Sequence, residues 1–159
     1  MNQDLTSFFG KFKTLFNYLF FHKGFLAGGP APAGAFLSTN KNISRPNLQL
    51  HFLPLSLNKP GIISNIHGYT FNISLSRPKS RGEINVVSSD PTSHPLIKAN
   101  YLSHIQDKKN LIEGIKITRK IANSNTFKKH NSIEIQPGSE CVSDFELLIS
   151  SIRSLPIKF

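Results

Sequence analysis

The stretch from Ser76 to Ser103, SRPKSRGEINVVSSDPTSHPLIKANYLS, places the strongest constraint on the fold. Its basic beginning contains a proline, and Gly82 follows, a combination that favours a sharp turn. Ile84 and Val86 then alternate with polar neighbours, which predicts a half-buried strand over residues 83–88. One Asp-Pro pair and one His-Pro pair then impose extended or turn conformations before a helical pattern begins. The stretch therefore marks the change from a strand-rich half to a helix-rich half.

Strand patterns dominate before this stretch. Apolar and polar residues alternate over residues 46–53 and 68–76, which predicts two strands, and a shorter strand is expected at 33–38. Residues 55–67 have the composition of a polar loop. Three or four strands with short connections favour an antiparallel sheet that buries one face and leaves the other available for a ligand or another domain.

Helical patterns dominate after it. Ser103 and Gln106 match a capping box, which predicts a helix from there to about Asn123. Gly114 lies inside this helix at a cost in helix propensity, which predicts close packing against the sheet. A second capping box at residues 143–146 opens a helix that runs to about residue 154. The predicted fold class is α+β, an antiparallel sheet of about four or more strands covered by helices on one face.

A Phe-rich segment precedes the sheet. Apolar residues recur at helical spacing over residues 5–21, which predicts an amphipathic helix within residues 1–23. The favoured interpretation is a helix whose apolar face serves packing. A membrane-surface helix is the alternative, because Lys11 and Lys13 add positive charge.

Charge and cysteine content limit the partners. The chain carries a formal net charge of +10, which in general favours nucleic acid or an anionic membrane. The basic residues are spread along the chain without a dense run, so no nucleic-acid partner is expected. The single cysteine, Cys141, excludes an internal disulfide. No signal peptide is recognised, and the apolar cluster at residues 15–21 is too short to span a bilayer.

Few residues are candidates for chemistry. The six histidines are scattered without the spacing of metal ligands, so no metal site is expected. Neither a G-x-S-x-G motif nor a G-x-G-x-x-G motif is present, so no catalytic or cofactor-binding residue is predicted from motifs. Gln49 and His51 lie on the polar face of a predicted strand and His67 at the start of another, where they could line a pocket.

Several segments, in order, resemble a known family. These are AGAF at 33–36, PNLQLHFLP at 46–54, the central stretch with its NYLSH continuation, LIEGIKITRKIA at 111–122 and E-x-x-P-G-x-E-x-x-S-D at 134–144. Together they resemble the C-terminal, substrate-side region of glucose-methanol-choline (GMC) flavin oxidoreductases, with the choline dehydrogenases and bacterial alcohol dehydrogenases as the most similar members. The resemblance covers about residues 24–152.

The resemblance implies an FAD enzyme that transfers hydride from an alcohol carbon to the flavin. It implies a substrate-binding domain over residues 24–154, in which a sheet covers the flavin and helices cover the far side. The polar sheet face with Gln49 and His51 would then face the flavin cavity, and His67 is similar to a family position near the substrate. The partners would be a small alcohol and the FAD-domain portion of the enzyme.

The departures from the family set further expectations. The G-x-G-x-x-G motif and the H-P-x-G-T-C segment with the family's catalytic histidine are not in this sequence. We therefore expect the FAD-binding domain to be absent, residues 155–159 to be a truncated tail, and the 159 residues alone to be inactive. The resemblance places Pro32 where choline-oxidising relatives have a carboxylate that holds the trimethylammonium group. Proline cannot pair with a cation, so a neutral alcohol is favoured over choline as the substrate. A cytoplasmic location is expected, with attachment to the inner membrane left open.

Two alternatives of other classes remain at this point. A stand-alone basic binding module would bind polyanions with a steep salt dependence. A structural protein of the membrane surface would use the Phe-rich helix for attachment.

Overall fold

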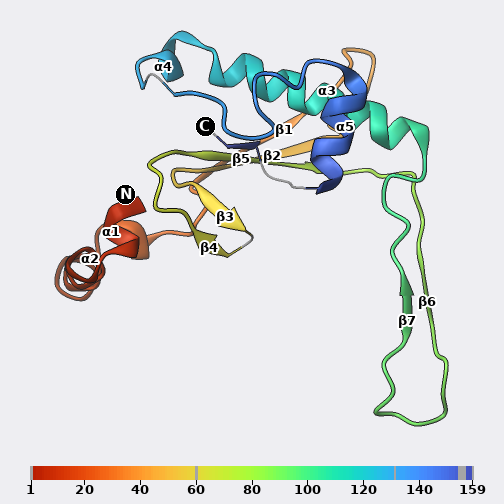
Figure 1. Ribbon diagram of the computed structural model, residues 1–159, viewed down its shortest axis with the longest axis horizontal. Coiled ribbons are helices and arrows are strands. Elements are labelled where there is room, and N and C mark those ends of the chain that lie inside the picture. The colour runs from red at the N-terminus through yellow and green to blue at the C-terminus, as the bar shows by residue number, and fades with distance from the viewer. Residues whose placement is uncertain (1, 60, 131, 154–156, 159) are drawn as a thin grey trace.

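A four-stranded antiparallel sheet forms the centre of the computed structural model, which describes residues 2–59, 61–130, 132–153 and 157–158 (Figure 1). Its strand order is β1-β2-β5-β8. The strands are β1 (Ala33–Leu37), β2 (Leu48–Leu53), β5 (Thr70–Leu75) and β8 (Ile157–Lys158). The predicted fold class is thereby confirmed, although the pairing of β8 with β5 was not expected from the sequence.

Helices cover one face of this sheet (Figure 1). The long helix α3 (Ile105–Ala122) packs on β5 and β2, and α5 (Asp144–Arg153) packs beside α3. The single-turn helix α4 (Asn125–Lys128) follows α3. The core between sheet and helices consists of Leu48, Leu50, Tyr69, Phe71, Ile73, Leu111, Ile112, Ile115, Ala122 and Leu147. Since burial of such side chains drives folding, this layer supplies most of the stability.

Two features fix how α3 sits on the sheet. A Cβ atom added to Gly114 would lie 3.1 Å from the Ile73 side chain and 3.2 Å from the Leu48 side chain, so the predicted close packing of this glycine is confirmed. At one end of the sheet the rings of Phe52, Tyr69, Phe71 and Phe127 form a cluster with centroids 5.2 to 5.9 Å apart. This cluster joins α4 to β2 and β5.

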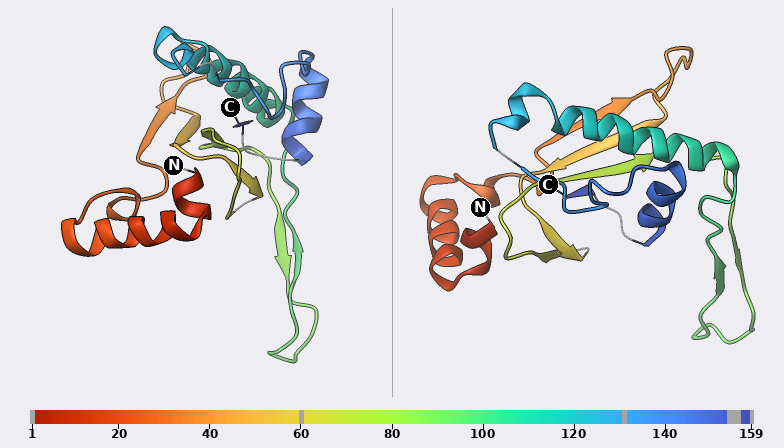
Figure 2. Two further views of the ribbon diagram at one scale, coloured as in Figure 1. Left: turned by 60° about the vertical axis from the view of Figure 1, so that its left-hand side comes forward. Right: turned by 45° about the horizontal axis from the view of Figure 1, so that its top comes forward.

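The opposite side of the sheet carries smaller elements (Figure 2). Helices α1 (Asn2–Thr6) and α2 (Phe8–Phe21) lead into the 3₁₀ turn η1 (Phe25–Ala27). The short hairpin β3 (Leu57–Lys59) and β4 (Ile62–Ile63) lies within the segment expected to be a polar loop. Asn2 connects α1 to this hairpin, because its side-chain amide donates to the Ser56 carbonyl at 3.0 Å and to the Ser64 carbonyl at 2.8 Å.

The helix predicted over residues 5–21 is divided in two. Ser7 adopts an extended conformation between α1 and α2, and its hydroxyl accepts a hydrogen bond from Gly10 N–H. Serine competes well as a helix cap, which explains the break. The packing interpretation of this segment was wrong within the described residues, since Phe8, Phe9 and Phe12 are 80%, 82% and 65% exposed.

The strand predicted at 83–88 takes a different form. Residues Glu83–Asn85 form β6, which pairs with β7 (Leu96–Lys98) in a two-stranded ribbon that projects away from the sheet (Figure 1). Ile84 and Val86 are exposed, so the prediction that they face a core was wrong. The strand covers only the first half of the predicted range 83–88, and the alternating pattern does not tell whether one of its faces is buried.

The capping predictions had different outcomes. His104, rather than Ser103, caps α3, and its Nδ1 accepts a hydrogen bond from Gln106 N–H at 3.0 Å. The second box was correct, because Glu146 accepts from the Ser143 N–H at 2.9 Å and the Ser143 hydroxyl accepts from the Glu146 N–H at 3.2 Å. These bonds to Ser143 lower the pKa of the Glu146 carboxyl. Of the predicted tail at 155–159, only the two residues of β8 are described.

Candidate functional site

The face of the sheet turned away from α3 carries a row of polar side chains. In the antiparallel register Gln49 lies opposite Ser74, and His51 lies opposite Asn72. Since residues directly opposite share a face, these four form one patch, which we call the polar row. The row alternates with the buried Leu48, Leu50 and Ile73 and thus faces away from the core.

The neighbouring strand β1 completes this face. Phe36 lies opposite Gln49 and is 65% exposed, while Gly34 lies opposite His51. A Cβ atom on Gly34 would lie 3.0 Å from the Leu50 carbonyl oxygen and 3.7 Å from Nδ1 of His51. The absence of a side chain at Gly34 therefore leaves room beside the half-buried His51 imidazole.

The chemistry of this face is polar and free of carboxylates. Strands β1, β2 and β5 contain no Asp or Glu, so the row offers amide, hydroxyl and imidazole groups only. Thr70 belongs to the same face, because it lies opposite Leu53. It is fully buried, and its hydroxyl oxygen has no hydrogen-bond partner among the described residues. Because the Thr70 hydroxyl is buried, the polar groups that this face presents are those of the polar row.

His67 lies in a separate place, at the end of the sheet. It borders an open cavity of about 630 Å³ together with Gly68, Tyr69, His130, Ser132, Ile133 and Ile135. The Tyr69 hydroxyl and the Ser132 hydroxyl are hydrogen-bonded at 2.6 Å across this region. Gln49, His51 and Pro32 are not among the residues that line this cavity.

The four site residues predicted from sequence are therefore only partly brought together. Gln49 and His51 share the polar row, His67 lines the end cavity, and Pro32 lies exposed immediately before β1. Sequence reasoning missed Phe36, Asn72 and Ser74. The alternation in residues 68–76 places Asn72 and Ser74 opposite the apolar face, so period-two patterning could have identified both.

A loop clamp joins the turn after β5 to the first turn of α3. The carboxylate of Asp107, buried in the first turn of α3, accepts hydrogen bonds from the backbone N–H of Lys79 at 2.9 Å and of Ser80 at 2.7 Å. Burial raises the pKa of this carboxyl, but the hydrogen bonds from Lys79 and Ser80 lower it by a larger amount. The net pKa of Asp107 is therefore below its usual value. The basic turn after β5 is thus held against α3 by its backbone N–H groups rather than by its basic side chains.

A second clamp holds the loop between α4 and α5. The Arg119 guanidinium donates to Glu134 from Nε at 2.9 Å and from Nη2 at 2.8 Å. It also donates to the carbonyl oxygens of Cys141 at 2.8 Å and Gly138 at 2.9 Å. A planar guanidinium suits this bidentate geometry, which a lysine could not reproduce. Lys116 adds an ion pair to Asp144 at 2.7 Å that connects α3 to α5.

The described residues fit a flavin in one limited way. A dinucleotide phosphate needs a glycine-rich turn between a strand and a helix, whereas Gly28 and Gly29 lie between η1 and β1. The polar row and the exposed Phe36 beside it could instead contact a flat heteroaromatic ring through amide, hydroxyl, imidazole and phenyl groups. In the described part of the chain, no group of three or more His, Cys, Asp or Glu residues could hold a metal ion.

Comparisons with known proteins identify a family and several similar enzymes. Residues 78–146, which include both clamps, match the GMC oxidoreductase family. An alcohol dehydrogenase (acceptor) of Pseudomonas putida is 45% identical over 141 residues, which are 88% of this chain and 25% of that protein. Oxygen-dependent choline dehydrogenases of Klebsiella pneumoniae strain 342 and Escherichia coli strain HS are 40% and 37% identical over 133 residues, in each case 82% of this chain and 24% of the relative. The chain thus spans about a quarter of the length of these curated relatives.

Proposed function

We propose that this chain, whose residues 78–146 match the GMC oxidoreductase family, forms the substrate side of an FAD-dependent oxidoreductase acting on CH–OH groups. The observation that carries the proposal is the polar row. It presents Gln49 and His51 on a sheet face with α3 on the other side, and the matched segment supplies the contact of Asp107 with Lys79 that joins the turn after β5 to α3. The similarity to an alcohol dehydrogenase over 88% of the chain supports it.

The residues of this chain would bind and orient. Gln49, Asn72 and Ser74 provide donors and acceptors for an alcohol hydroxyl or a ring edge, and Phe36 provides an apolar surface beside them. Bound FAD would supply the acceptor for the hydride that leaves the alcohol carbon. Its phosphates would be held outside the described residues, which lack a suitable turn. The remaining FAD-binding portion of the enzyme is accordingly the proposed partner.

The substrate we propose is a neutral primary alcohol. A trimethylammonium group is held best by a carboxylate or an aromatic cage, and β1, β2 and β5 offer no carboxylate. Pro32, immediately before β1, contributes no charge either. We therefore expect turnover of aliphatic alcohols to exceed turnover of choline.

A chimera tests the proposal. The matched 141 residues of this chain would replace the corresponding quarter of the Pseudomonas putida alcohol dehydrogenase, and turnover of a primary aliphatic alcohol would be followed with an artificial electron acceptor. We expect a yellow, flavin-containing protein with kcat/KM within about 100-fold of the parent enzyme. The matched control is the same chimera with Gln49→Leu and His51→Leu. A chimera that retains no flavin, or that retains flavin but does not turn over the alcohol, contradicts the proposed function. Turnover of choline at a rate comparable to that of the aliphatic alcohol contradicts the proposed substrate.

A further inference from the structure

Helix α2 carries its apolar face outward. Six side chains form what we call the Phe face, namely Phe8, Phe9, Phe12, Phe16, Leu19 and Phe20, which are between 43% and 82% exposed. At 3.6 residues per turn they lie within an arc of about 120°. A continuous exposed surface of this kind marks an interaction site rather than scattered surface residues.

The orientation of α2 is fixed by its opposite side. Gly10 is buried there, and a Cβ atom on it would lie 2.5 Å from Cα of Asp4 in α1. Thr14 and Asn17, on the same side, line a small cavity of about 170 Å³ with Leu5 and other residues of the α1–η1 corner. The helix could not rotate to bury the Phe face without breaking this packing.

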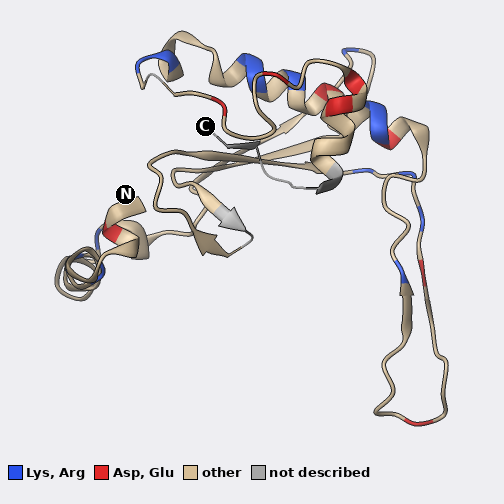
Figure 3. Cartoon of the chain, in the orientation of Figure 1, with Lys and Arg blue, Asp and Glu red and all other residues tan. Residues whose placement is uncertain are grey.

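The charges around the Phe face favour an anionic partner. In the same helical projection, Lys11 and Lys13 lie at its two edges, and both are exposed. No Asp or Glu occurs in residues 5–82, which contain nine Lys and Arg residues. Figure 3 shows the acidic residues on the layer of α3 and α5, the adjoining loops, the ribbon and α1, whose one acidic residue is Asp4.

We propose that the Phe face is a docking surface for an anionic membrane, in which the Phe rings insert among the lipid chains while Lys11 and Lys13 contact lipid headgroups. An apolar arc bordered by lysines is the arrangement of helices that lie in the membrane interface. Helix α2 has 14 residues and is about 21 Å long, too short to cross the hydrocarbon core. No helix in the described part of the chain is long and apolar enough to span a membrane. Docking of a second copy through the same face would bring four lysines together, which disfavours that occupant.

Fluorescence provides the first test, because the chain contains no Trp. Phe12→Trp places a single probe in the Phe face, and Val86→Trp places a matched probe on the exposed ribbon. With vesicles of phosphatidylglycerol and phosphatidylcholine we expect a blue shift for Phe12→Trp only, and at most a weak shift with phosphatidylcholine alone. A shift for both probes, or for neither, overturns the proposal.

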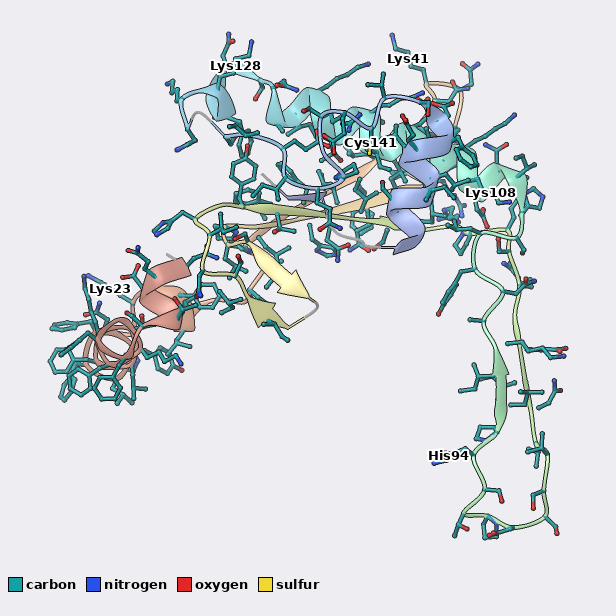
Figure 4. The ribbon with its side chains drawn as sticks, viewed as in Figure 1. Lys23, Lys41, His94, Lys108, Lys128 and Cys141 are labelled. Atoms are coloured by element: carbon teal, nitrogen blue, oxygen red, sulfur yellow. The ribbon has the colours of Figure 1, made fainter. Side chains whose placement is uncertain are left out.

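Vesicle sedimentation of the unlabelled chain provides the second test. The triple variant Phe8→Ser, Phe12→Ser, Leu19→Ser should weaken binding to the anionic vesicles at least about tenfold, whereas Ile84→Ser, Val86→Ser, Val87→Ser should leave it unchanged. Lys11→Glu with Lys13→Glu should weaken it roughly a hundredfold or more, and Lys128→Glu with Lys129→Glu on α4 much less. Figure 4 shows Lys128 on α4, on the other side of the sheet from α2.

The remaining outcomes decide against the proposal. Equal effects of each pair of variants would show that binding depends on total charge or total apolar surface. Concentration-dependent dimerisation that the Phe8, Phe12, Leu19 triple variant abolishes, without vesicle binding by the unsubstituted chain, would assign the Phe face to a second copy. These measurements use neither flavin nor alcohol, so their outcome is independent of the proposed enzymatic function.

Discussion

Asp107 in α3 accepts a 2.9 Å hydrogen bond from the backbone N–H of Lys79, 28 residues earlier in the chain. This contact joins the turn that leaves β5 to the first turn of the covering helix. The side chain of Lys79 has no part in the bond, so the basic residues of this turn are placed by their backbone. The turn is therefore a structural junction between the sheet and its helices.

Removing the Asp107 charge should destabilise the fold. We expect Asp107→Asn to lower the free energy of unfolding by about 1–3 kcal/mol at neutral pH, because the backbone N–H groups of Lys79 and Ser80 lose the charged, buried acceptor that Asp107 provides. Urea denaturation measures this loss. Asp90→Asn in the ribbon is the matched control, since the Asp90 side chain accepts only from neighbours in its own loop, and its stability should be unchanged.

The Asp107 contact also predicts a pH dependence. The pKa of Asp107 is lowered from 3.8, so its contribution is fully present above about that pH and is lost as the pH falls through the lower folded value. The stability difference between the unsubstituted chain and Asp107→Asn should accordingly shrink in acid. A difference that stays constant from pH 7 to strong acid would contradict this assignment.

Replacing Arg119 by lysine should not preserve the second clamp. Arg119→Lys keeps the charge but cannot contact Glu134, Gly138 and Cys141 together, so we expect a loss of roughly 2–3 kcal/mol in the free energy of unfolding. Lys120→Ala, on the exposed side of the same helix, should change stability by less than about 0.5 kcal/mol. Equal stability of Arg119→Lys and the unsubstituted chain would show that charge alone holds this loop.

Gly114 should tolerate alanine but not valine. Alanine gains about 1 kcal/mol in helix propensity, which offsets the tight contact of its Cβ with Ile73 and Leu48. Gly114→Val should cost about 1–3 kcal/mol from overpacking. Glu113→Val at the neighbouring exposed position controls for the effect of a β-branched residue in a helix. Thermal unfolding that is the same for both valine variants would show that α3 does not pack closely at Gly114.

The polar row should affect catalysis more than stability. In the chimera, His51→Leu should lower kcat/KM for a primary alcohol by about tenfold or more while urea stability is retained. His67→Leu in the same assay tests the end cavity separately, because His67 does not share the row. A larger effect of His67→Leu than of His51→Leu would move the substrate to that cavity. Lys120→Ala serves as the unaffected control.

The sequence predicted the sheet and its covering helices well, because both rely on local periodicity. The apolar alternation of β2 and β5 and the inner face of α3 each repeat at the period of their element. The capping box at Ser143 and the close packing at Gly114 follow from single-residue chemistry. The sheet face of Gln49 and His51 was predicted for the same reason.

The features that failed depend on what lies nearby in space. Periodicity cannot say whether Ile84 faces a core or solvent, nor whether the Phe residues of α2 face inward or outward. His51 lies on β2, whereas His67 lies in the segment before β5, so the two histidines are at different sites although the sequence makes both of them candidates. The partnership of Asp107 with Lys79 joins segments that no local pattern connects.

Anaerobic flavin reduction is the measurement that tests the proposed function most directly. The flavin-containing chimera would be mixed with a primary aliphatic alcohol in the absence of any electron acceptor, and the oxidised flavin band would be followed. We predict that the band bleaches with the alcohol, that choline bleaches it much more slowly, and that the Gln49→Leu, His51→Leu chimera is impaired. A chimera that binds flavin but keeps its oxidised band in the presence of alcohol would contradict the assignment of this chain to the substrate side of an alcohol-oxidising flavoenzyme.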